Sequence, residues 1–187
     1  MKIGLKYALP FAVLAYLPLQ AMAAPQITFQ GEITDQTCQV SVNGQTNSIV
    51  LLPTVALSNF NTLTAGGNAG LTPFTISLTG CQANNTGSAI AVKTNFLGYN
   101  VDDTEKVLGN TLTGSTAATG FGIELLTSSS GGAKINLDGV TPVAGLEIAD
   151  GADSASYDFG AQYYSLGGNN QKAGKISATA EYTISYL

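Results

Sequence analysis

The strongest constraint on the fold is a period-two alternation over residues 174–187. Every second residue of this stretch is small or apolar, and the residues between them are mostly polar. A strand with this pattern buries one face, and its edge must be paired because an open edge accepts strands from other chains. The expected buried face carries Ile176, Ala178, Ala180, Tyr182, Ile184 and Tyr186. Residues 174–187 are therefore expected either to complete the chain's own sheet or to form a junction with another chain.

Residues 1–23 have the features of a secretory signal peptide. Two lysines precede an apolar run over residues 7–19, and Ala21-Met22-Ala23 forms a small-x-small cleavage site. The apolar run is too short for a membrane anchor. We expect the mature chain to begin at Ala24 and to be secreted or periplasmic.

The chain after residue 23 is acidic but carries few charges. It contains five lysines, 12 acidic residues and no arginine, which gives a net charge of −7. Nucleic acid is therefore a poor partner, because phosphate binding needs lysine and arginine. The sequence has no histidine, so it contains no Ser-His-Asp unit, no Cys-His unit and no imidazole metal site. We expect neither an enzyme nor a cofactor.

Two small groups of acidic residues leave this expectation unchanged. Asp102, Asp103 and Glu105 lie close in sequence, as do Asp150 and Asp153. A calcium site needs more oxygen ligands at loop spacing. We expect both groups to lie in solvated loops.

The sequence contains two cysteines, Cys38 and Cys81. An even count in an exported chain predicts one disulfide bond. The bond would close a loop of about 44 residues and would stabilise the fold by roughly 4 kcal/mol at most. Because no Cys-x-x-Cys motif is present, we interpret the bond as a structural cross-link.

Most apolar segments are short, alternate with period two and are bounded by turn residues, as strands are. Strong turn signals occur at Asn43-Gly44 and Asp138-Gly139. The facing of residues 89–94 is ambiguous, and a short helical turn is expected around residues 55–63. Many short strands joined by small-residue turns predict an all-β, immunoglobulin-like sandwich in one domain. The expected strands include residues 27–33, 40–42, 49–52, 74–81, 89–94, 121–125, 135–137, 159–163 and 174–187.

Several motifs occur at positions that are typical of one protein family. Gly174 is fourteenth from the last residue, Tyr186 is penultimate, and Gly31 precedes Cys38 by seven residues. Between them lie Phe74-x-Ile76-x-Leu78-x-Gly80-Cys81, Ala118-x-Gly120-x-Gly122-Ile123-x-Leu125-Leu126 and Phe159-x-Ala161-x-Tyr163. With these motifs in this order, the chain resembles the pilins of the chaperone–usher fimbriae, close to the type 1 and P pilus subunits.

The resemblance implies an incomplete immunoglobulin-like sandwich that lacks its last strand and is completed by a donor strand from a neighbouring subunit. It also implies three parts: a signal peptide at 1–23, a donor-strand extension at 24–33 and a pilin domain at 34–187. A periplasmic chaperone is expected to lend a strand during export. At an outer-membrane usher, that strand is then expected to be exchanged for the extension of the next subunit. This usher is the one expected contact of the chain with a membrane.

The resemblance further implies roles for individual residues. The donated face is expected to carry Ile27, Phe29, Gly31 and Ile33. The C-terminal strand is expected to border the acceptor groove and to face the chaperone through Gly174, Ile176, Tyr182, Ile184 and Tyr186. As an alternative or additional role, Gly174 is a turn residue with positive φ.

The expected function is that of a structural subunit of a surface fimbria. The subunit would polymerise head to tail with copies of itself and with other pilins, and would support cell adhesion. Two other functions stay open: a minor adaptor pilin and a stand-alone carbohydrate-binding module. Self-complementation, in which the chain's own N-terminus fills its own groove, is a further structural alternative.

Overall fold

The structure is a computed structural model, and it describes residues 33, 35–36, 38–60, 64–83 and 85–187. All of them belong to the unit Glu32–Leu187. The expected signal peptide and three of the expected donor residues, Ile27, Phe29 and Gly31, lie outside the described residues. No helix in the described part is long and apolar enough to cross a membrane.

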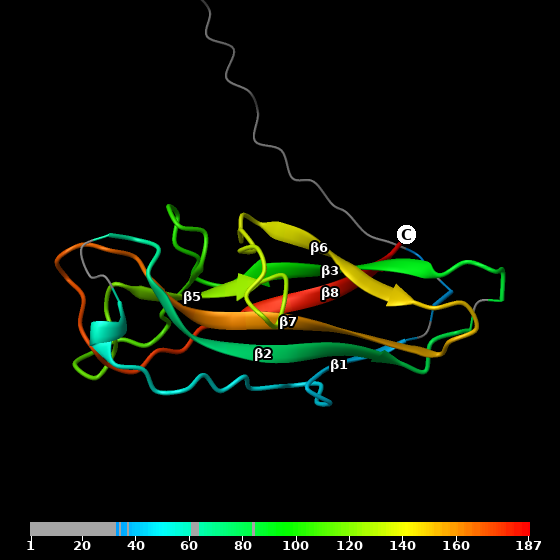
Figure 1. Cartoon of the computed structure of the whole chain (residues 1–187), viewed down its shortest axis with the longest axis horizontal. Coiled ribbons are helices and arrows are strands. Elements are labelled where there is room, and N and C mark those ends of the chain that lie inside the picture. Colours follow the sequence, from blue (N-terminus) through cyan, green and yellow to red (C-terminus); the bar gives the residue numbers. More distant parts are fainter. Residues whose placement is uncertain (1–32, 34, 37, 61–63, 84) are drawn as a thin grey trace, which may run out of the picture. The chain divides into compact units, whose positions relative to one another are not determined.

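Two antiparallel sheets enclose one apolar core (Figure 1). The larger sheet has the strand order β1-β2-β7-β5-β4, and the smaller has the order β6-β3-β8. The strands are β1 (Gln39–Val42), β2 (Asn68–Thr79), β3 (Ile90–Gly98), β4 (Leu108–Gly109), β5 (Phe121–Leu126), β6 (Val140–Ile148), β7 (Ser154–Ser165) and β8 (Ala180–Tyr186). One turn of 3-10 helix, η1 (Leu57–Asn59), lies within the predicted helical turn. The predicted all-β sandwich is confirmed.

Alternate residues of the long strands fill the space between the sheets. In β3, Val92 and Phe96 are buried, which resolves the ambiguous facing of residues 89–94. Phe159 of β7 lies among other aromatic rings: its ring centroid is 5.6 Å from that of Phe74 and 5.3 Å from that of Phe96. Aromatic pairs at such distances contribute about 0.5–1.5 kcal/mol beyond the area that they bury.

The predicted disulfide bond is present. Cys38 lies just before β1 and Cys81 lies just after β2, and their Cα atoms are 4.1 Å apart. Because β1 and β2 pair antiparallel, the bond joins the start of one strand to the end of its neighbour. The cross-link therefore ties the entry of the chain to the larger sheet.

The predicted turn at Asn43-Gly44 is also present. Both residues have positive φ, 50° and 76°, and Val42 and Gln45 exchange two backbone hydrogen bonds across them. Two consecutive positive φ angles are the mark of the type I′ turn that this dipeptide favours.

The sandwich has two ends that position the functional site. We name one the cysteine end; it holds Cys38, Cys81, the start of β7 and the end of β8, Tyr186 (Figure 1). We name the other the glycine end; it holds residues 54–60, 110–120 and 165–175. Cys38, from which the described chain runs without a gap into β1, thus lies at the cysteine end.

Candidate functional site: an apolar groove beside the C-terminal strand

The C-terminal segment forms one wall of the site. Its second half is β8, which pairs with β3. Its first half, residues 172–179, is hydrogen-bonded mainly to residues 110–119 rather than to a sheet. The strand predicted from residue 174 onward is therefore confirmed from residue 180, and the extended chain before it keeps the same alternation of half-buried and exposed residues.

Gly174 allows two backbones to approach closely at the glycine end. A Cβ atom on Gly174 would lie 2.5 Å from the carbonyl carbon of Ala117 and 2.5 Å from the nitrogen of Ala118. Beside it, the N–H of Lys175 donates to the carbonyl of Thr116, and the N–H of Ala118 donates to the carbonyl of Lys175, each at 2.8 Å. Gly174 does not have a positive φ, so its interpretation as a turn glycine is wrong.

Asn110 fixes the same segment through its side chain. Its Nδ2 donates to the carbonyls of Ala118 and Lys175, both at 3.0 Å. Its Oδ1 accepts from the N–H groups of Leu112 and Ser177, both at 3.0 Å. One amide group therefore joins the C-terminal segment to two parts of the neighbouring loop. Nothing in the local sequence pattern indicated this role.

We expect Asn110→Ala to loosen the C-terminal segment. Side-chain hydrogen bonds contribute about 0.5–1.5 kcal/mol each, and water would replace part of those lost, so the free energy of unfolding should fall by about 1–3 kcal/mol. Urea denaturation would measure this loss, and hydrogen exchange should show faster exchange of the Ser177 amide. Asn47→Ala, at an exposed asparagine before the groove, is the matched control. Equal stability of the two variants would contradict the role assigned to Asn110.

Two adjacent hollows run beside the C-terminal segment. The first, the middle hollow, has a volume of about 570 Å³ and lies between residues 48–52 and 176–182. The second, the end hollow, has a volume of about 530 Å³ and lies at the glycine end between residues 54–60 and 172–176. Together they form an elongated groove over the core. Tyr163 and Ile176 line both hollows, and therefore lie where the two meet.

Residues 48–52 form the opposite wall of the middle hollow. Residues 49–52 of this segment were predicted to be a strand, but they belong to neither sheet. Among the described residues, no backbone hydrogen bond joins it to another segment. Val50 and Leu52 pack against the core, whereas Ile49 and Leu51 are 79% and 82% exposed. The segment thus has one face inward, and its backbone is not paired with any described strand.

The apolar face of the C-terminal segment is only half-buried. Tyr182, Ile184 and Tyr186 pack against the core but keep part of their surface exposed, and Ile176 is half-buried in the groove. By contrast, the neighbouring strand β3 buries Val92, Thr94 and Phe96. Of the predicted residues, Gly174, Ile176 and Tyr182 therefore line the two hollows, whereas Ile184 and Tyr186 lie further along β8 with part of their surface exposed.

Ile33 is the one predicted donor residue within the described part of the chain. Its side chain is fully exposed. It therefore does not fill the groove of its own chain in this structure.

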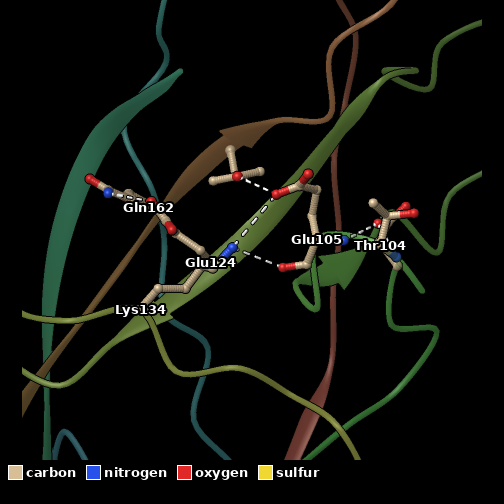
Figure 2. Close-up of polar contacts among 7 residues, drawn as sticks. Thr104, Glu105, Glu124, Lys134 and Gln162 are labelled. Atoms are coloured by element: carbon tan, nitrogen blue, oxygen red, sulfur yellow. Dashed lines mark hydrogen bonds and ion pairs between the residues drawn. The ribbon is translucent and has the colours of Figure 1, made fainter. Parts of the chain in front are cut away.

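A second polar cluster lies on β5, β7 and the nearby loops (Figure 2). Glu124 is buried and accepts a hydrogen bond of 2.5 Å from Gln162. Lys134 donates to the carbonyl of Glu105 at 2.9 Å, and its Nζ is 3.7 Å from the Glu105 carboxylate. That carboxylate also accepts from the Tyr164 hydroxyl, and burial together with Glu105 raises the pKa of Tyr164 to about 12. The expectation that Glu105 lies in a solvated loop is wrong, because its carboxylate is partly buried and paired.

The buried carboxyl of Glu124 should make stability depend on pH. Burial raises its pKa above the ordinary value of 4.5, and the Gln162 hydrogen bond and the Lys134 charge oppose this shift only in part. The raised pKa means that the folded state holds this proton more tightly than the unfolded state does. The resulting stabilisation is complete below pH 4.5 and is lost as the pH rises through the folded-state pKa.

We therefore expect Glu124→Gln to gain stability relative to the wild type as the pH rises. The variant keeps an oxygen that accepts from Gln162 but removes the titrating group. Urea denaturation at about pH 4 and about pH 7 would measure the difference in free energy of unfolding. Glu147→Gln, at an exposed position on β6, serves as the control. A constant difference between wild type and Glu124→Gln across this range would contradict the prediction.

The comparison with known proteins agrees with this architecture. A β-sandwich with an apolar groove along its last strand suggests a pilus subunit, and the sequence matches the family model "Fimbrial protein" over residues 27–187. The chain belongs to the fimbrial protein family and is a structural subunit of a surface fimbria.

Individual relatives include both major and minor subunits. The chain is 36% identical over 184 residues to the major fimbrial subunit SMF-1 of Stenotrophomonas maltophilia, which covers 93% of this chain and 99% of that protein. It is 31% identical over 182 residues to the minor fimbrial subunit HifD of Haemophilus influenzae, and the match covers 94% of this chain and 79% of HifD. The solved structure of the P pilus rod subunit PapA is similar in fold, with a TM-score of 0.59 and 18% identity. The match covers 80% of this chain and 99% of PapA.

Proposed function

We propose that the chain polymerises head to tail by donor-strand exchange, with residues 24–33 of one subunit filling the groove of the next. One observation carries the proposal: the middle hollow lies between two extended segments with unpaired edges. β8 is the edge strand of the smaller sheet, and residues 48–52, on the opposite side, form no backbone hydrogen bond with another described segment. A strand inserted between them would form hydrogen bonds with both walls and cover the apolar floor.

The donor segment has the length and pattern that such a groove needs. Residues 27–33 would extend for about 20 Å, and the wall of residues 174–182 extends for about 26 Å at a strand rise of about 3.3 Å per residue. Ile27, Phe29 and Ile33 share one face, and burial of each would contribute about 1.5–3 kcal/mol. With ladder hydrogen bonds of about 0.5–1.5 kcal/mol each, the junction would approach the stability of a small domain, about 5–15 kcal/mol.

The two ends of the sandwich favour one direction for the donated strand. The wall of residues 174–186 runs from the glycine end to the cysteine end. If the donor runs antiparallel to it, Ile33 arrives at the glycine end of the acceptor. The cysteine end of the donor then meets the glycine end of the acceptor, and repetition gives a non-closing, head-to-tail fibre. The parallel direction would instead bring two cysteine ends together.

The same open edge accounts for the proposed assembly partners. Before assembly, a half-buried apolar face beside an unpaired strand edge makes the free subunit prone to aggregate. A periplasmic chaperone that lends a strand would cover this edge, and an outer-membrane usher would catalyse its exchange. This route includes removal of residues 1–23 on export, and leaves 24–33 as the extension and 34–187 as the pilin domain.

Photo-crosslinking between two populations of the chain tests the proposal. Phe29 is replaced by p-benzoylphenylalanine, and isotopically heavy and light copies are assembled together before irradiation and mass spectrometry. We expect crosslinks from position 29 of one copy to residues of the middle hollow, such as Ala178 or Tyr182, of the other. The same photoreactive residue at Tyr99, which is 68% exposed, is the control.

Each result has a distinct meaning. Heavy–light crosslinks into the groove support donation between subunits. Crosslinks within single copies would support self-complementation and would contradict the proposal, as would an absence of crosslinks into the groove.

A role as a minor adaptor is the second candidate, because the relatives include the minor subunit HifD as well as major subunits. Immunogold electron microscopy with an antibody against this chain separates the two roles. Labelling along whole fibres would identify a major shaft subunit. Gold confined to fibre tips would identify a minor subunit.

A further inference from the structure

The glycine end carries an isolated positive charge. Among residues 54–60, 110–120 and 165–175, the charged residues are Lys172 and Lys175, and both are exposed. Both line the end hollow. The ion pairs recorded in the described part of the chain use other lysines. The end hollow is therefore positively charged, although the chain as a whole has a net charge of −5.

The opposite end of the sandwich is acidic. Asp150 and Asp153 are exposed in the connection from β6 to β7, next to Cys81, whose N–H donates to the Asp153 carbonyl. Asp35 is exposed three residues before Cys38. On the smaller sheet, Lys93 lies toward the same end, because it pairs with Ser185 on β8. The two ends thus carry opposite charges.

The donor segment has the same asymmetry. Residues 24–31 contain no charged side chain, whereas Glu32 and Asp35 flank Ile33. Antiparallel insertion would bring these carboxylates to the end hollow, beside the two lysines. Parallel insertion would bring them to the cysteine end of the groove, which has acidic neighbours.

We infer that Lys172 and Lys175 form a docking site for Glu32 and Asp35 of a second copy of this chain. The inference rests on the proposed donation of residues 24–33, and it adds an electrostatic device that selects the direction of insertion and speeds the first contact. Opposite charges on neighbouring antiparallel strands stabilise their pairing. Charges at the rim of an interface act mainly on the association rate, and salt weakens them.

Polymerisation kinetics of the mature chain, refolded from denaturant, test this docking site. Light scattering and electron microscopy follow assembly at ionic strengths of about 0.01 M and about 1 M, where the Debye length is about 30 Å and about 3 Å. We expect Lys172→Glu with Lys175→Glu to slow assembly about tenfold or more at low salt and to have little effect at high salt. As a control, Lys106→Glu changes the net charge as much as Lys175→Glu alone does, at a residue outside the end hollow; it should assemble at nearly the wild-type rate, whereas Lys175→Glu should assemble more slowly at low salt.

A charge exchange within one chain gives the decisive comparison. Adding Glu32→Lys and Asp35→Lys to the slow variant restores opposite charges across the junction, and should restore rapid, salt-sensitive assembly. A fluorescent peptide of residues 24–36 should likewise bind the folded wild-type chain faster than the Lys172→Glu, Lys175→Glu chain at low salt.

The outcomes separate this inference from the proposed function. If the peptide binds the wild type and the Lys172→Glu, Lys175→Glu chain equally fast, and the two chains assemble equally fast, the docking site is overturned but strand donation stays intact. If the peptide binds no variant and no fibres form with the wild type, strand donation itself fails, and the docking site fails with it.

Discussion

Gly174→Ala is expected to destabilise the sandwich and to prevent its assembly. The added Cβ would meet backbone atoms of Ala117 and Ala118 at 2.5 Å and the carbonyl oxygen of Thr116 at 2.6 Å. Backbone atoms held by hydrogen bonds cannot move aside as the end of a side chain can. The C-terminal segment must therefore shift, and we expect a loss of about 1–3 kcal/mol or more in the free energy of unfolding.

The same shift would displace the wall of the end hollow, because residues 172–176 line it. We expect the variant to be folded at low temperature but to form few or no fibres by electron microscopy. Gly114→Ala is an informative control: its φ is +91°, and nothing lies within 4 Å of the added Cβ. It reports the strain of a positive φ alone, about 1–2 kcal/mol. If Gly174→Ala behaves no worse than this control, close backbone approach is not what Gly174 provides.

Gly31→Leu is expected to abolish fibre formation without lowering the stability of the monomer. In the proposed antiparallel register, Ile33 enters the end hollow, and residue 31 then crosses the position where the two hollows meet. Tyr163 and Ile176 line that position. A leucine side chain there would collide with Tyr163, whereas a glycine lets the strand pass close to it.

Electron microscopy of fibres and urea denaturation of the monomer would measure these two expectations. Gln30→Leu is the matched control, because residue 30 lies on the opposite face of the expected strand. Fibres of normal length from Gly31→Leu would contradict the assigned register. A loss of monomer stability in Gly31→Leu alone would instead point to a role for residue 31 within its own subunit.

The sequence predicted the parts of this fold that depend on local pattern. Alternation placed Ile176, Tyr182, Ile184 and Tyr186 on one face, and in the structure all four are half-buried, with Ile176 and Tyr182 lining the groove. The type I′ turn followed from Asn43-Gly44, since only a few residues tolerate two positive φ angles. The disulfide followed from two cysteines in a chain expected to be exported.

Features that depend on tertiary packing were missed. Residues 49–52 have strand composition, but none of the described strands pairs with them. Asn110 looked like an ordinary loop residue, because its partners at Lys175 and Ser177 are more than 60 residues away in sequence. The cluster around Glu105 and Glu124 was missed for the same reason: sequence spacing does not reveal that Lys134 and Tyr164 approach Glu105.

The disulfide between Cys38 and Cys81 has a mechanical consequence for a fibre under tension. In the proposed assembly, pulling force enters each subunit through the extension, just before Cys38. The cross-link passes part of that force directly to the end of β2, which is paired with β7 along most of its length. The short strand β1 therefore does not have to resist the pull alone. Tension is directed along the strands of the larger sheet, where many hydrogen bonds must shear together rather than open one at a time.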